Sequence, residues 1–497
     1  MAKKDLLPDL INSLSVNEKR YFSLFSSISP GEQNFKKLFN ALNGETAYDS
    51  KRIGQKLGNT RMNIAYEKAY LQKVLLKSLR NFNDDASVEI ALHNTLIEVE
   101  VLYNKQQYDL ALGLIKKSIP DAEKKDLYLL QLLLIRWEQR CMLRMGQYDY
   151  LEKQYTRGVK KEQQLMSLAE NISHYRALHS YMFAMINRKG NVTRASDRKK
   201  LAEIKRHPLM KSPALAKSFY AKLSYYEILI AWYHHRYELK KAYTCTKQVL
   251  RLFEQDSFRI KQNPQAYYSF LSNFFNRALS IDNMEEAAVT LDKIGSLILE
   301  YHDVLPLSQR KEMTSTLTER KLILLTFTFE YKKAVALAEA IIQEIEKPKS
   351  GYRQGFLITI YFFAALNYFH LKNFERALAF QRKIIDQFDY KVRLDFVFMT
   401  HVLHFITHLE LKHFDMLPHL LRAIQRFIKT QDLQNKANNM LLVFFNELIK
   451  TNGNTHLTKE VIRKYQPLFL PYKNDPTQNV VLETLDLYKW IEGKGGI

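Results

Sequence analysis

Three arginines spaced four residues apart form a conspicuous charge cluster: Arg136, Arg140 and Arg144. On a helix this spacing places all three guanidinium groups on one face. Guanidinium groups bind carboxylates and phosphates through paired hydrogen bonds. The neighbouring Glu138 is expected to point away from this face. The pattern predicts a site for an anionic ligand; the simpler alternative is a solvated surface, or one paired with acids of adjacent helices.

Aromatic residues gather in the middle of the chain, often as neighbours such as Tyr225 with Tyr226 and Trp232 with Tyr233. Most of them must pack in the core. Tyr and Trp are also preferred anchors of protein interfaces. We predict that a peptide-binding groove in this region is lined by Tyr225, Trp232 and Asn276.

A loose helix-turn-helix spacing near the N-terminus offers a DNA-binding alternative. Gly54, Gly58 and Ile64 stand at the intervals of that motif, although such spacing is common by chance. The plainer interpretation is a turn between two core helices. If the motif reads DNA, the contacts are Lys56, Arg61 and Asn63.

Basic residues are concentrated between positions 188 and 217, which carry ten Lys or Arg against two acids. The whole chain has a formal charge of +22. Such a segment suits a phosphate-rich partner. Interleaved aromatic residues, which would indicate base stacking, are missing here. An ordinary basic surface is therefore the alternative to nucleic-acid contact.

Five of the fourteen histidines lie between residues 401 and 419. His404 and His408 share a helix face with His401 nearby, but a metal site needs further converging ligands. Glu410 and His413 have the spacing of a di-iron bundle without the required second copy. We interpret this cluster as helix packing. Phosphate-loop, dinucleotide, zinc-protease and nucleophile-elbow motifs are all missing, so no catalytic residue, cofactor or metal ligand is predicted.

The composition indicates long helices that would position these residues. The 497 residues include only 15 Gly and 12 Pro, so few residues interrupt regular structure. Two cysteines, Cys141 and Cys245, are too few for a disulfide framework or a cysteine-built zinc site. The uncharged stretch from 354 to 371 is interpreted as a buried helix, not a membrane span. We expect an all-α, cytoplasmic protein.

An internal repeat is visible in the turns between these helices. Each turn is followed by a large apolar anchor, and in four cases an Ala stands three residues later, which lets two helices approach closely. The anchors are separated by 40 to 47 residues, except for one gap of 89 that we interpret as two units divided by a turn at 189–192. The anchors are Tyr108, Tyr148, Tyr237, Met284, Tyr331, Phe374 and Phe414.

The clearest unit, from Tyr361 to Ala377, resembles a tetratricopeptide repeat. Tyr361 and Tyr368 match the aromatic positions of that family, and Ala365 and Ala377 match its small packing positions. The period is longer than the family's 34 residues, and the closing proline is missing. The resemblance implies a right-handed superhelix of about eight or nine antiparallel helix pairs that binds a protein or peptide in its concave groove.

Three parts of the chain are expected. Residues 1–82 form a helical module, in which Ser15 and Glu18 make a capping box and a long helix runs from about Thr60 to Leu79. This module is similar to the N-terminal segment of a group of uncharacterised bacterial repeat proteins, which implies no activity. Residues 83–466 carry the repeats. Residues 467–497 form one closing helix, Val480 to Ile491, and a flexible Gly-rich tail. The favoured function is that of a non-enzymatic scaffold, which binds an acidic protein or peptide. The alternative is a DNA-binding regulator.

Overall fold

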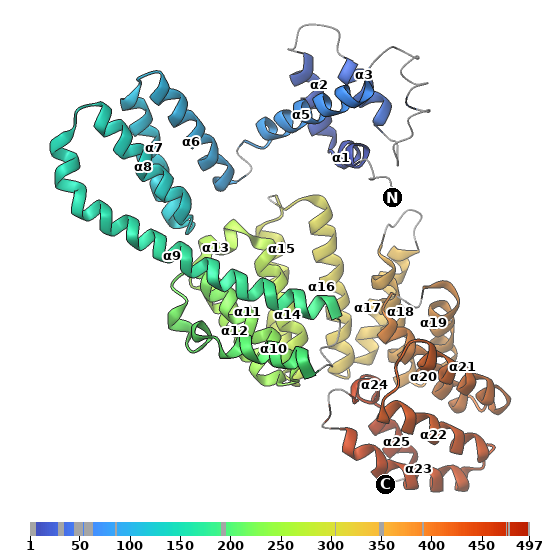
Figure 1. Ribbon diagram of the computed structural model, residues 1–497. Coiled ribbons are helices and arrows are strands. Elements are labelled where there is room, and N and C mark those ends of the chain that lie inside the picture. The colour runs from blue at the N-terminus through green and yellow to red at the C-terminus, as the bar shows by residue number, and fades with distance from the viewer. Residues whose placement is uncertain are drawn as a thin grey trace. The chain divides into compact units, whose positions relative to one another are not determined.

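The computed structural model describes residues 6–27, 34–43, 53, 63–84, 87–189, 195–303, 305–346, 352–389, 392–473, 475 and 478–495. Regular structure in these ranges is entirely helical (Figure 1). The chain divides into two compact units. Unit 1 comprises Met1–His174 and Lys217–Ala221, and unit 2 comprises Tyr175–Ala216 and Lys222–Ile497.

The N-terminal module of unit 1 follows the sequence prediction closely. The capping box is confirmed: the Ser15 N–H donates to the Glu18 carboxylate at 2.7 Å, and the Glu18 N–H donates to the Ser15 hydroxyl at 3.2 Å. The Phe22 and Phe39 rings pack against each other at a tilt, with centroids 4.5 Å apart, inside the module's own apolar core. The described helices are α1 (Leu7–Ser13), α2 (Val16–Ser27), α3 (Asn34–Leu42) and α5 (Ile64–Phe82).

Eight antiparallel helix pairs follow in the described residues, and they confirm the tetratricopeptide-like repeat. One such pair cannot cover its own apolar stripe, so a repeat array buries it between neighbouring pairs. Two pairs begin in unit 1: α6 (Val88–Asn104) with α7 (Tyr108–Lys124), and α8 (Tyr128–Arg144) with α9 (Tyr148–Lys189). The remaining pairs, which lie in unit 2 apart from the first residues of α11, are α11 (Phe219–His235) with α12 (Leu239–Glu254), α14 (Pro264–Ser280) with α15 (Met284–Glu300), α16 (Leu307–Phe327) with α17 (Tyr331–Ile345), α18 (Gln354–His370) with α19 (Phe374–Gln387), α20 (Leu394–Glu410) with α21 (Leu417–Thr430), and α22 (Lys436–Lys450) with α23 (Thr455–Phe469).

The same hydrogen bond closes seven of the turns within these pairs. A backbone N–H donates to the carbonyl five residues earlier at 2.9–3.0 Å, and the residue before that N–H is left-handed. This arrangement is the Schellman motif, which ends the first helix and aims the second one back along it. The left-handed residues are Gln106, Gly146, Tyr237, Asp282, Phe329, Lys372 and Lys412.

This motif corrects one predicted anchor. Tyr237 occupies the left-handed position with φ of 57°, so the residue equivalent to the other anchors is Leu239, the first residue of α12. The prediction of Tyr237 as the anchor is wrong because aromatic residues are also the anchors of other turns, so residue type does not distinguish the two positions. With the corrected register Ala242 falls three residues after the anchor. It is buried like the four predicted alanines, so five turns share this close approach: at Ala111, Ala242, Ala287, Ala334 and Ala377.

The long gap between anchors does not contain two regular units. The continuous helix α9 has 42 residues and fills half of the gap, ending at Lys189. Of the predicted dividing turn at 189–192, only Lys189 lies in the described residues. A short helix, α10 (Ala195–Arg206), and two 3-10 turns, η1 (Pro208–Met210) and η2 (Pro213–Leu215), precede α11. The repeat is therefore interrupted here by an elongated helix and an inserted one.

Unit 2 contains a large apolar core that runs through its last repeats. The predicted buried helix is α18, in which every residue from Ile358 to Phe369 is buried. No helix within the described ranges has the length and apolar character needed to cross a membrane. One short helix, α13 (Ser257–Gln262), and two 3-10 turns, η3 (Phe414–Met416) and η4 (Leu470–Tyr472), complete the described connections.

The C-terminal segment differs from the expected single helix and loose tail. It forms two helices, α24 (Val480–Thr484) and α25 (Leu487–Gly495), separated by a left-handed Asp486. Leu485 and Ile491 are buried in the same core as the last repeats. The helix therefore continues through Gly495, although glycines there predicted a tail, because apolar side chains dock it.

Candidate functional site

The three predicted arginines lie on α8 and are all exposed to solvent. The opposite face of α8 packs through Leu134 and Cys141 into the core of the first repeats, which holds the arginine face outward. Arg140 lies 4.8 Å from the centre of the Trp137 ring. The Nε of Arg144 donates to the Tyr103 hydroxyl at 3.1 Å, so this arginine is already engaged.

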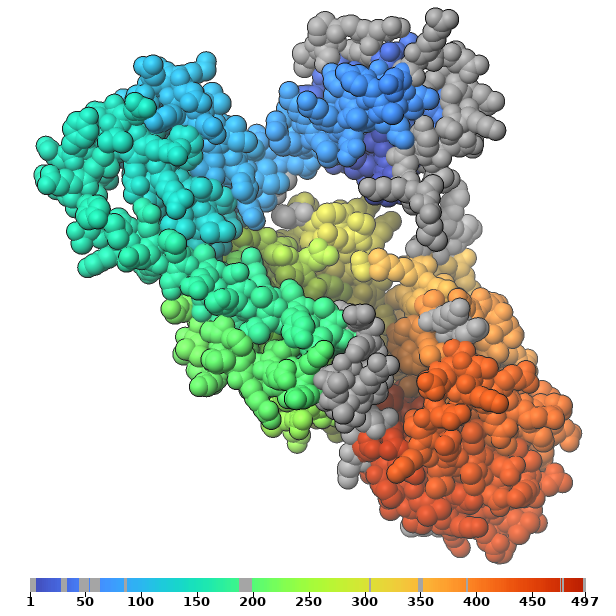
Figure 2. All heavy atoms as spheres, viewed as in Figure 1, coloured from blue at the N-terminus to red at the C-terminus, as the bar shows by residue number. Residues whose placement is uncertain are grey.

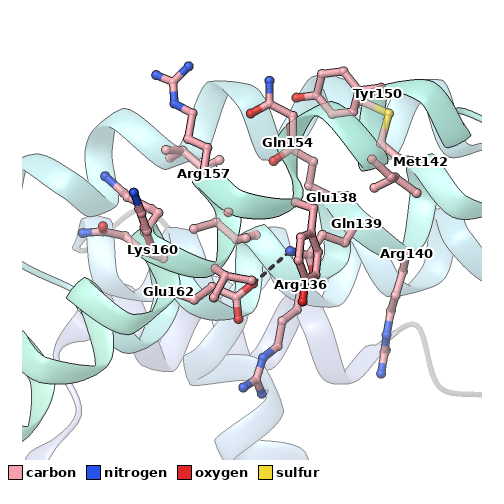
Figure 3. A pocket seen from close by; sticks show the side chains of 18 of the residues that line it. Arg136, Glu138, Gln139, Arg140, Met142, Tyr150, Gln154, Arg157, Lys160 and Glu162 are labelled. Atoms are coloured by element: carbon pink, nitrogen blue, oxygen red, sulfur yellow. Dashed lines mark hydrogen bonds between the residues drawn. The ribbon is translucent and has the colours of Figure 1, made fainter.

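A hollow with a volume of about 1020 Å³ opens between α8 and the first half of α9 (Figure 3), and Ile119 and Glu123 of α7 also line it. Figure 2 shows gaps in the sphere surface of this teal segment. The lining includes Arg136 and Arg140 but not Arg144. In Figure 3 the guanidinium groups of Arg136 and Arg140 extend to the same side of α8. The structure thus brings two of the three predicted arginines to one rim.

Basic residues from α9 complete the lining, and sequence reasoning missed them. They are Arg157, Lys160 and Lys161, and Figure 3 shows Arg157 extending away from the side of Arg136. Repeat spacing gives no sign that α9 stands apart from α8, so these residues read as ordinary helix surface. Their charge means that both rims of the hollow are basic.

Three carboxylates also line the hollow, and two of them have protein partners. The Lys161 ammonium pairs with Glu123 at 2.8 Å, and the Gln139 side-chain amide donates to Glu162 at 2.8 Å. Contrary to the sequence interpretation, Glu138 faces the hollow. Burial raises the pKa of Glu138, against an opposing effect of Lys116.

The two arginines of the shared rim therefore keep their hydrogen-bonding capacity for a ligand. Among the described residues no carboxylate forms an ion pair with Arg136 or Arg140. An anion placed across this rim would meet two guanidinium groups, each able to donate a fork of hydrogen bonds.

Apolar side chains in the same hollow remain uncovered. Tyr155 is 72% exposed and Leu143 is 56% exposed, and Tyr150 and Val159 are also exposed. Packed helix pairs normally cover such residues, as the α18–α19 pair does. Exposed apolar surface beside unpaired cations is typical of a protein-interaction site.

The predicted aromatic groove does not assemble as a unit. Tyr225 is only 5% exposed and packs against Tyr175 of α9, with ring centroids 6.3 Å apart. Its burial contradicts the expectation that it faces a groove. Asn276 is exposed on α14, and Trp232 lines a separate small cavity.

The predicted DNA contacts are only partly in view. Lys56 and Arg61 lie outside the described residues. Asn63 caps α5, its side chain accepting a hydrogen bond from the Tyr66 N–H at 3.2 Å. This contact gives Asn63 a structural role at the helix start, and DNA binding stays a prediction.

The histidine cluster is engaged in helix packing. His404 is buried and its Nδ1 lies 2.9 Å from the Gln381 side-chain oxygen. Burial lowers the pKa of His404 to about 3, so it is neutral at physiological pH. The Nδ1 atoms of His408 and His413 are 3.0 Å apart.

The last repeats of unit 2 are covered by the chain's own C-terminus. The Trp490 indole N–H and the Lys494 ammonium both bind the Glu410 carboxylate at 2.7 Å. The Lys489 ammonium lies 4.8 Å from the centre of the Phe329 ring. Helix α25 therefore packs across the ends of α16 and α20 and covers this face of the last repeats.

Comparison with known proteins gives weak matches of fold only. No family model and no curated protein sequence matches this chain. The apo form of RapI aligns with a TM-score of 0.39 and 12% identity, over 82% of this chain and 99% of RapI. A signal transduction ATPase with a tetratricopeptide repeat sensor, from Pyrococcus horikoshii, aligns with a TM-score of 0.39 and 13% identity, over 89% of this chain and 68% of that one. At this level of similarity neither protein's function transfers to this chain.

Proposed function

We propose that this protein is a non-enzymatic binding scaffold, and that the hollow between α8 and α9 receives an acidic segment of a protein partner. One observation carries the proposal: Arg136 and Arg140 lie unpaired, among the described residues, on the rim of a hollow with exposed apolar lining. Carboxylates of the segment bind these two guanidinium groups, and an apolar side chain enters the hollow.

The energetics favour this pairing of charge and apolar contact. Hydrogen bonds to a charged group contribute about 1.5–3 kcal/mol each when water is displaced. Arginine and aromatic residues also dominate the binding energy of protein interfaces. Tyr150 and Tyr155 supply such aromatic surface in the lining of the same hollow. A segment with alternating acidic and apolar residues would use both features at once.

The open state of the hollow also favours it over the face of the last repeats as a binding site. The face of the last repeats that α25 crosses would require displacement of buried side chains such as Ile491 before a partner could bind. The hollow in unit 1 needs no such rearrangement.

The test is a binding titration with defined peptides. A fluorescent 12-residue peptide of alternating Glu and Leu or Trp is compared with a Lys-containing counterpart, using the full chain. We expect the acidic peptide to bind and the basic one to fail. The double variant Arg136→Glu/Arg140→Glu should lose at least about a hundredfold in affinity, since both charge-assisted contacts become repulsive.

Lys73→Glu/Lys77→Glu is the matched control, because both lysines are exposed on α5, neither lines the hollow, and the change in charge equals that of the double arginine variant. It should change the affinity by less than about twofold, as expected for screened surface charges outside the site. Equal loss in the control and the double variant would mean that only the overall charge of +22 attracts the peptide. That result would refute the proposed site.

A further inference from the structure

A second cavity lies where the inserted helix α10 meets the turn between α11 and α12. Its volume is about 350 Å³, and its position is created by α10, an element outside the repeat pattern. Its main lining residues are Lys205, Arg206, Trp232, Arg236, Glu238 and Lys241.

Four of these side chains are basic and one is acidic. Glu238 holds two of the cations, with its carboxylate 2.7 Å from the Arg236 Nε and 2.5 Å from the Lys241 ammonium. Hydrogen bonds from Lys241 and Arg236 lower the pKa of Glu238, so it remains ionised. Among the described residues no carboxylate pairs with Lys205 or Arg206. The cavity therefore keeps a net positive charge.

Aromatic rings hold the two paired cations in place. The Arg236 guanidinium lies 5.3 Å from the centre of the Trp232 ring, and the Lys241 ammonium lies 5.5 Å from the centre of the Tyr233 ring. Cation–π contacts of this kind fix long side chains that would otherwise lose more freedom on binding. Arg236 uses only Nε for Glu238, which leaves its terminal nitrogens available to a ligand.

We propose that this cavity binds a phosphate monoester group of a small molecule or a phosphorylated side chain. Four cations around a cavity of this size would repel one another, and an anion with several acceptor oxygens relieves that repulsion. The volume lies at the lower end of the range for small-molecule sites, which suits a compact group. This inference is independent of the hollow between α8 and α9.

A nucleic-acid strand fits the cavity less well. Single-stranded nucleic acid binds by stacking bases on exposed aromatic faces along a basic groove. Arg236 and Lys241 each already occupy a face of Trp232 or Tyr233. These rings therefore support the cations, and the basic stretch at 188–217 contributes to the cavity chiefly through Lys205 and Arg206.

The test is calorimetric titration of the full chain with inorganic phosphate, phosphoserine and a nucleoside monophosphate. We expect phosphate to bind and added salt to weaken it. A tighter nucleoside monophosphate would identify a small-molecule source, and tighter phosphoserine a phosphorylated side chain. Lys205→Gln/Arg206→Gln should weaken binding at least about tenfold, because two charge-assisted contacts are lost. The matched control is Lys199→Gln/Lys200→Gln, two exposed residues of α10 outside the cavity, which should have little effect.

Two outcomes would overturn this proposal. One is no phosphate binding by the wild-type chain. The other is an equal loss of phosphate affinity in both double variants, combined with binding of an oligonucleotide that phosphate does not displace. That result would assign the residues to an extended basic surface. Circular dichroism checks folding, and the single variant Arg206→Gln, at an exposed position, must still weaken binding if the double variant misfolds.

Discussion

At two equivalent positions of the Schellman turns, we predict that substitutions change the free energy of unfolding in opposite directions. Gly146 and Tyr237 occupy the same left-handed place, with φ of 70° and 57°, in the turns before α9 and α12. A residue with a Cβ pays roughly 1–2 kcal/mol to adopt this conformation, whereas glycine does not. Glycine loses more chain entropy on folding, which offsets roughly 0.4–1 kcal/mol of that difference.

The expected net effects follow from these two values. Tyr237→Gly should stabilise its turn by about 0.5–1 kcal/mol, because Tyr237 is 48% exposed and contributes little packing. Gly146→Ala should destabilise its turn by a similar amount. The nearest atom to an added Cβ there is on the Tyr148 ring at 3.7 Å, so no clash adds to the conformational cost.

Hydrogen exchange measured by mass spectrometry is the suitable assay, because it reports the opening of each helix pair separately. A change of 1 kcal/mol alters the protection of amides by about fivefold. Peptides from α11 and α12 should exchange more slowly in Tyr237→Gly, and peptides from α8 and the start of α9 faster in Gly146→Ala. If Tyr237→Gly instead loosens α12, Tyr237 is a packing anchor after all and the corrected register is wrong.

Three further predictions use the same structure. Gly453→Ala should destabilise the α22–α23 pair by at least about 2 kcal/mol, because the added Cβ would lie 2.3 Å from the Phe414 ring and the φ of Gly453 is 77°. Thermal unfolding measures this loss, and an unchanged melting temperature would contradict the prediction. Arg144→Gln should change the affinity for the acidic peptide by less than about twofold, and Arg140→Gln by about tenfold; equal losses would show that the whole arginine face binds instead of the rim. Burial raises the pKa of Glu227 to about 7 because the folded state disfavours its ionised form; this costs no stability below pH 4.5, and stability falls as the pH rises from 4.5 through 7. Wild-type stability should therefore fall relative to Glu227→Gln between pH 5 and 8 in denaturant titrations, and parallel curves would refute the shift.

Much of the fold could be predicted because local chemistry and repeat spacing agree. The capping box at Ser15 and the buried helix α18 are encoded by residues close in sequence, so no tertiary information was needed. The alanine after each anchor is likewise a local signal of close helix approach. The prediction at Tyr237 was wrong because its residue type suggested an anchor. The register depends on a left-handed backbone conformation, which a tyrosine in the sequence does not indicate.

The candidate site was predictable only in part, for a physical reason. Arg136 and Arg140 are recognisable because a four-residue spacing fixes their common face on any helix. The contribution of Arg157 depends on how far α9 stands from α8, which is a tertiary property. Tyr225 was misassigned for the same reason, since the ring that packs against it is Tyr175, from the second half of α9.

Both proposed sites occur where the repeat pattern breaks. A regular helix pair covers its apolar stripe, and the α18–α19 pair leaves nothing comparable exposed on α18. The first half of α9 instead leaves Tyr155 and Leu143 uncovered beside the arginine rim, and α10 adds Lys205 and Arg206 to the α11–α12 turn. Repetition alone builds a stable array, so an interruption that exposes apolar and basic side chains has no structural benefit of its own. This contrast is the physical reason for seeking the binding functions at α9 and α10, before the regular repeats of unit 2.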